Sequence, residues 1–226
     1  MNYVHLGACV GDFDNKCGFT KFVKKNSSIH DKIFLIEANP KNIPKLKKNY
    51  KNYKNSKIFN IGISSKKNKK ETFFYTEDDA PHYKVCSMNK NHVFKHYPKS
   101  IIKKFEIKTV EINNLFKNYI REKTIDYLSI DIEGIDYEIL TKINFKRYNI
   151  LNISVEYLHL SKNQKKKLIN HLIKHGYSYC GFGYDHNNFD FLFKKKKIFF
   201  NNVIARLLWI VSKKHYFFLN HFIIRN

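Results

Sequence analysis

Short apolar runs alternate with amphipathic segments along most of this chain, from residue 3 to about residue 193. Strands buried in a parallel sheet are near-continuous apolar runs, whereas surface helices place their apolar residues three or four positions apart. The apolar runs predict strands at residues 3–6, 33–37, 57–61, 71–75, 105–110, 125–130, 150–155, 177–182 and 189–193.

The amphipathic segments predict the helices that join these strands. We expect them at residues 18–25, from Pro40 to about residue 53, at 112–122, at 136–143, and from Ser161 to Gly176. Ser161 and Gln164 have the spacing of a capping box that opens the last helix, and Gly176 ends it. Residues 76–98 show little periodicity, so we expect a long loop there with about one helical turn.

Strands that alternate with helices predict an α/β fold, in which a doubly wound, mostly parallel sheet is covered on both faces. The strand at 71–75 lies outside the regular alternation, and the last two strands are expected to form an antiparallel hairpin at the sheet edge. We therefore expect one domain over residues 1–193, followed by a tail over residues 194–226.

In such a sheet, ligands bind at the carboxyl ends of the strands, near the point where the strand order reverses. The residues just beyond predicted strands are the loop 7–12, Glu37, Asn60, 131–134 and 156–159. Glycines let the backbone approach a ligand, and an acidic residue after the second strand accepts ribose hydroxyls. These features indicate an adenosine-type cofactor. The loop reads Gly-Ala-Cys-Val-Gly, which lacks the G-x-G-x-x-G dinucleotide fingerprint and disfavours NAD.

Four segments at these strand ends resemble the successive sequence blocks of FkbM-family methyltransferases. The most specific is the last, in which Asp-x-Glu-Gly is followed by an acidic, apolar helix start; the segments are 4–11, 34–40, 60–64 and 127–134. The resemblance covers roughly residues 3–193 and implies a class I methyltransferase (Rossmann-like) fold that uses S-adenosylmethionine. Members of this family typically methylate hydroxyl groups, often on sugars of glycolipids, capsules or secondary metabolites.

The resemblance also assigns expected roles to individual residues. Gly7, Ala8 and Gly11 would line the methionine end of the cofactor, Glu37 would hold its ribose, Asn60 and Ile61 would lie beside the adenine, and Asp131 would lie beside the reacting centre. Two positions depart from the pattern: His5 stands where the family usually has Asp, and Cys9 where Asn is common.

Methyl transfer to a hydroxyl needs the nucleophile in line with the methyl group and a base within hydrogen-bond reach of the hydroxyl proton. Asp131 is the first candidate for this base, followed by His82 and His159. Asp131, Glu133 and Glu156 also offer oxygen ligands for a divalent metal, but nothing in the sequence fixes their mutual distances, so metal dependence is the less favoured alternative.

The charge balance raises a second interpretation. The chain carries 42 Lys and Arg against 19 Asp and Glu, a formal net charge of +23, which invites a nucleic-acid partner. However, only four of the basic residues are Arg, the residue that binds phosphates and bases in bidentate fashion. A biased composition on a solvated surface explains the charge better, so an RNA methyltransferase remains the alternative and a nucleic-acid partner is disfavoured.

The tail at 194–226 contains no acidic residue and begins with four lysines. Its apolar residues have an amphipathic arrangement that fits two alternatives. One is a terminal helix docked on the sheet or on a second subunit. The other is an interfacial helix in peripheral contact with an anionic membrane, which would suit a lipid-linked sugar acceptor. Four cysteines without paired spacing and the lack of a secretory signal predict a cytoplasmic location. A third alternative, a degenerate Rossmann module without activity, rests on His5 and on the start of the chain at the first strand.

Overall fold

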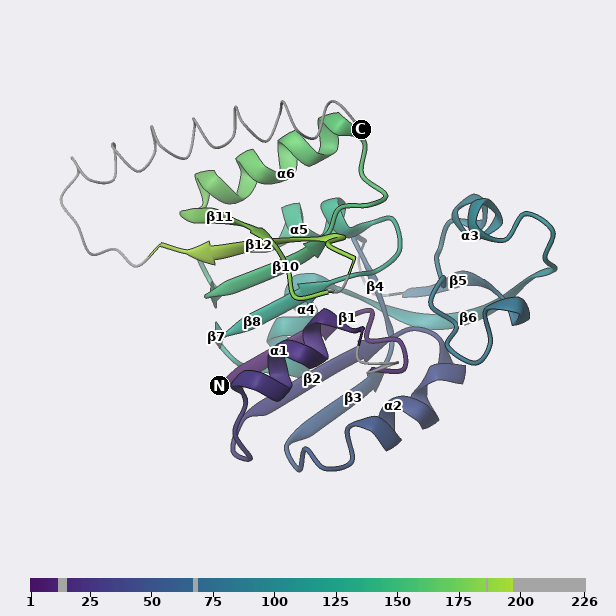
Figure 1. The fold of residues 1–226 in the computed structure, drawn as a ribbon, viewed down its shortest axis with the longest axis horizontal. Coiled ribbons are helices and arrows are strands. Elements are labelled where there is room, and N and C mark those ends of the chain that lie inside the picture. The colour runs from purple at the N-terminus through teal and green to yellow at the C-terminus, as the bar shows by residue number, and fades with distance from the viewer. Residues whose placement is uncertain (12–15, 67–68, 186, 197–226) are drawn as a thin grey trace.

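The computed structural model describes residues 1–11, 16–66, 69–185 and 187–196. Within them, seven strands form one large sheet, which confirms the predicted α/β class (Figure 1). In spatial order these strands are β11 (Tyr177–Phe182), β12 (Asp190–Lys195), β10 (Asn152–Glu156), β8 (Tyr127–Ile130), β1 (Asn2–Leu6), β2 (Lys32–Glu37) and β3 (Ser56–Asn60).

This sheet is parallel except for β12, which pairs antiparallel with both β10 and β11. The chain order reverses at β1, which lies between β2 and β8. The antiparallel pair β11–β12 at one edge confirms the predicted terminal hairpin, with β12 inside and β11 outermost. The order and the single antiparallel strand are those of the class I methyltransferase fold that the sequence predicted.

Helices cover both faces of the large sheet, so alternate residues of its strands enter two separate cores. Ile33 and Leu35 of β2 belong to the core that contains Phe19 of α1 (Gly18–Asn26) and Leu46 of α2 (Ile43–Asn49). Phe34 and Ile36 belong to the larger core, which α4 (Ile112–Leu115), α5 (Asp136–Lys142) and α6 (Lys162–Lys174) complete. Burial on both faces explains why the central strands are near-continuous apolar runs.

Two smaller sheets complete the described fold. One contains β4 (Gly62–Ser64), β6 (Ile102–Glu111) and β5 (Lys69–Thr76), and the other pairs β7 (Thr124–Ile125) with β9 (Asn149–Ile150). Figure 1 shows β5, β6 and α3 (Lys90–His96) grouped to one side of the large sheet. The strand predicted at 71–75 therefore lies outside the large sheet, as its place in the sequence indicated.

Several predicted boundaries are wrong for identifiable reasons. The helix expected to reach residue 53 ends at Asn49, because the Tyr50 ring turns into the core and its hydroxyl bonds the Thr20 hydroxyl at 2.8 Å. The helix expected over 112–122 ends at Ile120: α4 passes into a π-helical turn (Phe116–Ile120), and Arg121 closes it with a left-handed backbone.

The segment 76–98 contains more helix than predicted: a 3-10 turn (Glu77–Asp79) and the two-turn α3. Another 3-10 turn (Pro40–Asn42) precedes α2. Strand β12 runs two residues beyond the predicted domain end at 193, and the expected interfacial helix falls at 198–211, outside the described residues. None of the helices in the described part of the chain has the length and apolarity that a membrane span requires.

Candidate active site

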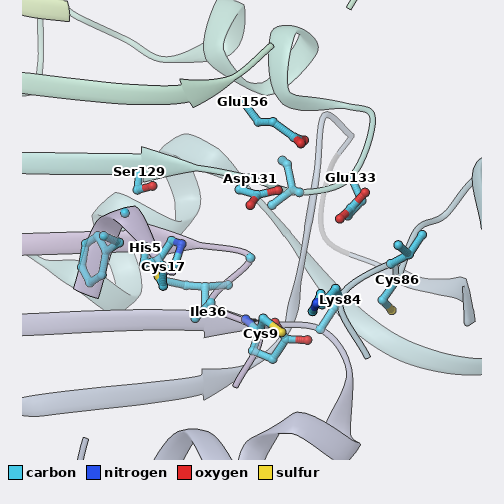
Figure 2. A pocket seen from close by; sticks show the side chains of 18 of the residues that line it. His5, Cys9, Cys17, Ile36, Lys84, Cys86, Ser129, Asp131, Glu133 and Glu156 are labelled. Carbon is cyan, nitrogen blue, oxygen red and sulfur yellow. Dashed lines mark hydrogen bonds between the residues drawn. The ribbon is translucent and has the colours of Figure 1, made fainter. Parts of the chain in front are cut away.

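A cavity of about 500 Å³ opens where β1, β2, β8 and β10 end. Figure 2 shows the side chains of Asp131, Glu133 and Glu156 on one side of it, with Cys9 and Lys84 opposite. The position agrees with the rule that ligands bind beyond the carboxyl ends of the strands, at the point where their order reverses.

The loop after β1 forms one wall of the cavity and is held against its neighbours by backbone contacts. The Gly7 and Ala8 N–H groups both donate to the Ile36 carbonyl, at 3.0 and 2.9 Å. Gly7 has a φ of +79°, and a Cβ there would lie 1.6 Å from the Asp131 carbonyl oxygen. Only glycine lets β1 and β8 approach so closely at their ends.

Glu37 at the end of β2 is buried and organises the loops on either side of it. Its Oε2 accepts from the Cys9 N–H at 2.7 Å, and its Oε1 accepts from the Asn39 N–H at 2.7 Å and from the Asn42 amide at 3.3 Å. Burial raises the pKa of this carboxyl to about 7, against the lowering effect of those hydrogen bonds. Because Oε2 accepts only one of these bonds, it keeps acceptor capacity for a ligand.

Asp131 and Glu156 extend from the neighbouring strands β8 and β10 into the same cavity. Burial raises the pKa of both carboxyls, and their mutual repulsion raises that of Glu156 further. Two buried carboxyls this close do not ionise together, so the pair holds a proton that it can exchange with a ligand.

The Asp-x-Glu-Gly loop after β8 is shaped by the first residue of the following helix. Asp136 accepts from the Ile132 N–H at 2.8 Å and from the Gly134 N–H at 3.1 Å. These bonds turn the loop so that Glu133, with a φ of +56°, presents its carboxylate to the cavity. Burial raises the pKa of Glu133 to about 8.

Three histidines surround that carboxylate. His92 and His159 place Nε2 at 2.8 and 3.5 Å from Glu133 Oε2, and the His96 ring lies 5.0 Å from that of His92. His159 Nε2 also lies 3.6 Å from Glu156 Oε1, which joins this group to the Asp131–Glu156 pair. Burial lowers the pKa of all three imidazoles, to about 4 for His159.

His5, one of the departures from the family pattern, is buried at the inner end of the cavity. Its ring stacks on Phe19 with the centroids 4.4 Å apart, and burial lowers its pKa to about 3. Its Nδ1 has no hydrogen-bond partner among the described residues. A buried polar atom without a partner is costly, which favours a ligand that bonds to it.

Most of the residues that the sequence singled out line this cavity: Gly7, Ala8, Gly11, Glu37, Ile61, Asp131 and His159. Asn60 and His82 are not among its lining residues. The Asn60 amide donates to the Glu37 and Ala38 carbonyls at 2.9 and 3.0 Å, so it ties two strand ends together. His82 places Nε2 3.1 Å from Lys45 Nζ. The roles predicted for all of these residues remain predictions.

The possible metal ligands group differently from the sequence-based expectation. Glu133 joins the histidines, whereas Asp131 and Glu156 lie with Asp136. Sequence reasoning missed His92 and His96 because they lie in a segment without periodicity; their separation by four positions on a helix was the available signal.

The family model of the FkbM methyltransferase domain matches residues 5–182. The chain belongs to the FkbM methyltransferase family. Among curated proteins, no sequence relative matches the chain. The predicted family and the class I fold are thereby confirmed.

Several solved methyltransferase structures are similar to this FkbM chain. Aeropyrum pernix fibrillarin, with natively bound S-adenosyl-L-methionine, is 10% identical with a TM-score of 0.43, over 85% of this chain and 64% of that one. Methanococcus jannaschii fibrillarin is 12% identical with a TM-score of 0.44, over 86% and 66%. The Geobacter metallireducens precorrin-6y C5,15-methyltransferase is 11% identical with a TM-score of 0.44, over 87% and 80%. The chain thus spans slightly less than two thirds of the two fibrillarins.

The cavity of this FkbM-family protein fits S-adenosylmethionine chemically. Its volume lies within the range of about 300–1,000 Å³ typical of small-molecule sites. Among the described residues, Glu37 keeps an acceptor position and His5 Nδ1 has no partner, and the carboxyls suit a positively charged sulfonium. The residues present therefore match the hydroxyls, polar amino-acid end and cationic centre of this cofactor.

Proposed function

We propose that this protein is an O-methyltransferase that acts on a hydroxyl group of a sugar, a glycolipid or a related glycan. The observation that carries the proposal is the acidic lining of the cavity in a strongly basic chain. Six carboxyls line it against two lysines: Glu37, Asp131, Glu133, Glu156, Asp185 and Asp190, with Lys16 and Lys84.

An acidic cavity favours a neutral, hydroxyl-rich acceptor over RNA. Nucleic-acid binding depends on Lys and Arg that neutralise phosphates, and carboxylates repel the same phosphates. Carboxyl groups accept hydrogen bonds from hydroxyls, and a buried carboxyl of raised pKa is a stronger base once it is ionised. In contrast to the net charge of +23, the lining of this cavity contains more carboxyl groups than lysines.

For the cofactor, we assign the loop Gly7–Gly11 to the methionine end and Glu37 to the ribose hydroxyls. S-adenosylmethionine, when bound, supplies a methyl group on a sulfonium sulfur, and its transfer to oxygen leaves a neutral thioether. The Cys9 N–H donates a hydrogen bond to Glu37 Oε2 at 2.7 Å, which joins the loop Gly7–Gly11 to the residue assigned to the ribose. Ile61 lies on the cavity wall next to β2 and would contact the adenine.

For the acceptor, we assign Asp131 as the base, with Glu156 as the partner that takes up or shares the proton. Asp131 lies between the loop Gly7–Gly11 and Glu133, and its carbonyl oxygen packs against Gly7. A base there lies close to the methionine end of the cofactor, where the reacting methyl is carried. His159 contacts Glu156 and would relay the proton outward.

The first experiment compares Asp131→Asn with the parent protein. The exchange keeps the shape and removes the base, so turnover should fall by about 10²–10⁴-fold while the affinity for S-adenosylmethionine stays within a few fold. Release of S-adenosylhomocysteine measures turnover, and calorimetry measures affinity. Glu106→Gln, an exposed carboxyl on β6, is the matched control and should change neither.

The acceptor is tested by supplying neutral glycans, lipid-linked sugars and RNA in parallel assays. Methylation of a glycan, lost in Asp131→Asn, supports the proposal. Methylation of RNA alone would overturn the acceptor class, and a defect of Asp131→Asn confined to cofactor affinity would overturn its assignment as the base.

A further inference from the structure

His92, His96, Glu133 and His159 form a compact group at one side of the cavity. One ligand atom from each lies within 4.8 Å of the ligand atoms of the other three. Two of the residues come from α3, one from the loop after β8, and one from the loop after β10. We propose that this group binds a divalent transition-metal ion of the zinc class.

The distances are close to those of a tetrahedral centre. Donors bound to zinc at 2.0–2.1 Å stand about 3.3 Å apart. The two contacts to Glu133 Oε2, 2.8 Å from His92 and 3.5 Å from His159, lie on either side of this value. An ion would replace the proton shared by His92 and Glu133, and a small shift of the exposed His96 imidazole toward it would complete the set.

The residue types select the class of ion. Imidazole suits zinc, copper, iron and nickel, whereas magnesium and calcium prefer all-oxygen sites. Three neutral imidazoles and one carboxylate therefore favour Zn²⁺ or Co²⁺ and disfavour Mg²⁺. This set differs from the oxygen-only set of Asp131, Glu133 and Glu156 that the sequence suggested.

The surroundings hold the ligands in place and leave a path for the ion. Ser87 donates its hydroxyl to the Glu133 carbonyl at 2.8 Å and accepts from the Asn89 N–H at 3.1 Å. These bonds fix the start of α3 against the loop that carries Glu133, as supporting contacts do around metal ligands. His92, Glu133 and His159 are largely buried, with side-chain exposures of 11%, 16% and 17%, while His96 is exposed. The ion can therefore enter past His96.

A bound ion would join α3 to the loop that follows β8. In its absence, these two parts are joined by the His92–Glu133 contact and the Ser87 hydrogen bonds. The site shares His159 with the proposed proton relay. Metal binding is measured without methyl transfer, so a failure of this proposal is distinguishable from a failure of the proposed function.

The test uses the full chain after removal of metals with a chelator. Calorimetry should find one Zn²⁺ per chain, and Zn²⁺ at 100 times its dissociation constant should raise the melting temperature by about 5–10 °C. Co²⁺ should give the intense visible absorption of tetrahedral cobalt. Mg²⁺ at the same concentration should produce no shift.

Two variants separate this site from other histidines. His96→Ala removes an exposed ligand and should weaken Zn²⁺ binding at least tenfold and abolish the tetrahedral cobalt spectrum. His175→Ala is the matched control: His171 lies on α6 and His175 follows four positions later as its C-cap, with the ring centroids 4.4 Å apart. It should keep the full affinity and spectrum.

Glu133→Gln is the second ligand variant, and it should also lose the tetrahedral spectrum. Three results would overturn the proposal: no stoichiometric Zn²⁺ binding to the parent chain, full affinity in His96→Ala with loss in His175→Ala, or an equal shift with Mg²⁺. The last would indicate an oxygen site at Asp131, Asp136 and Glu156 instead.

Discussion

Two regions of the molecule are stabilised in different ways. One is the large sheet, and the other is the segment from β4 to β6, which we call the flanking segment (residues 62–111 without 67–68). All four residues of β8 are buried, whereas β6 buries only Thr109 and Val110 among ten. The flanking segment depends more on polar contacts: Asp79 accepts from Tyr97 at 2.7 Å and from the Val85 N–H at 2.8 Å. Burial on both faces fixes the strand ends of the large sheet that line the cavity. Local polar contacts position the lining residues that come from the flanking segment.

The sharpest test of this difference replaces one phenylalanine in each region. Phe34 in β2 is 1% exposed and belongs to the larger core, so Phe34→Ala should lower the free energy of unfolding by about 3–5 kcal/mol. Phe105 in β6 is half-buried and contacts Phe73 and Tyr75, so Phe105→Ala should lower it by only about 1 kcal/mol. Urea unfolding followed by circular dichroism measures both. Equal losses would contradict the division into two regions.

The second test addresses the junction of β1 and β8. Gly7→Ala adds a Cβ 1.6 Å from the Asp131 carbonyl oxygen, and backbone cannot yield as a side chain does, so we expect a loss of at least about 3 kcal/mol and of cofactor binding. Gly176→Ala is the control: φ there is +85°, but no atom of the described residues lies within 4 Å of the added Cβ. It should cost only about 1–2 kcal/mol, from the left-handed backbone. Similar losses in the two variants would show that backbone conformation, and not the approach of the strands, makes Gly7 necessary.

The same contrast explains what the sequence predicted well. Strands β1, β2 and β8 are mostly apolar because both faces are buried, with His5 and Ser129 as interruptions, and their positions were predicted within one or two residues. In β6, Lys103 and Lys104 are both exposed and lie beside half-buried neighbours, so the apolar pattern identified only residues 105–110 of Ile102–Glu111.

The residues of the site show the same difference in how well the sequence predicts them. Glu37 and Asp131 were identified because strand ends converge at one edge of a parallel sheet, a rule that needs only the order of the elements. His92 reaches Glu133 across 41 positions of sequence through a helix that no periodicity predicted. Such a contact depends on how the flanking segment folds over the cavity, which local patterns do not encode.

The third test uses Glu37, the buried carboxyl at the end of β2. The pKa of Glu37 is about 7 in the folded chain and about 4.5 unfolded, so between these values the folded state binds more protons. This contribution is fully present below pH 4.5 and is lost as pH rises through 7. Relative to Glu37→Gln, which does not titrate, the parent protein should lose at most about 3 kcal/mol over this window.

Urea unfolding of both proteins without cofactor, at pH 5 and at pH 7.5, gives this difference. The histidines and the other carboxyls are common to the two proteins and cancel. A difference that does not change with pH would mean that the hydrogen bonds from Cys9 and Asn39 keep Glu37 ionised throughout.

The smallest effects should come from the helix caps, one in each region. Ser161 forms the predicted capping box with Gln164 at the start of α6, a 13-residue helix that buries Leu168 and Leu172 against the large sheet. Asn89 accepts from the Asn91 N–H at 3.0 Å at the start of α3, which has seven residues and buries only Val93. Ser161→Ala should therefore lower the free energy of global unfolding by about 1 kcal/mol.

Asn89→Ala should leave global unfolding within about 0.5 kcal/mol, because α3 contributes little to either core. Its effect should be local: amide hydrogen exchange in α3 should accelerate several-fold while exchange in α6 stays unchanged. If Asn89→Ala lowered global stability as much as Ser161→Ala, α3 would unfold together with the large sheet, and the flanking segment would not be a separate unit of stability. Zn²⁺ should restore slow exchange in α3 if the proposed ion joins this helix to Glu133, which makes the weakest cap a sensitive reporter of the bound metal.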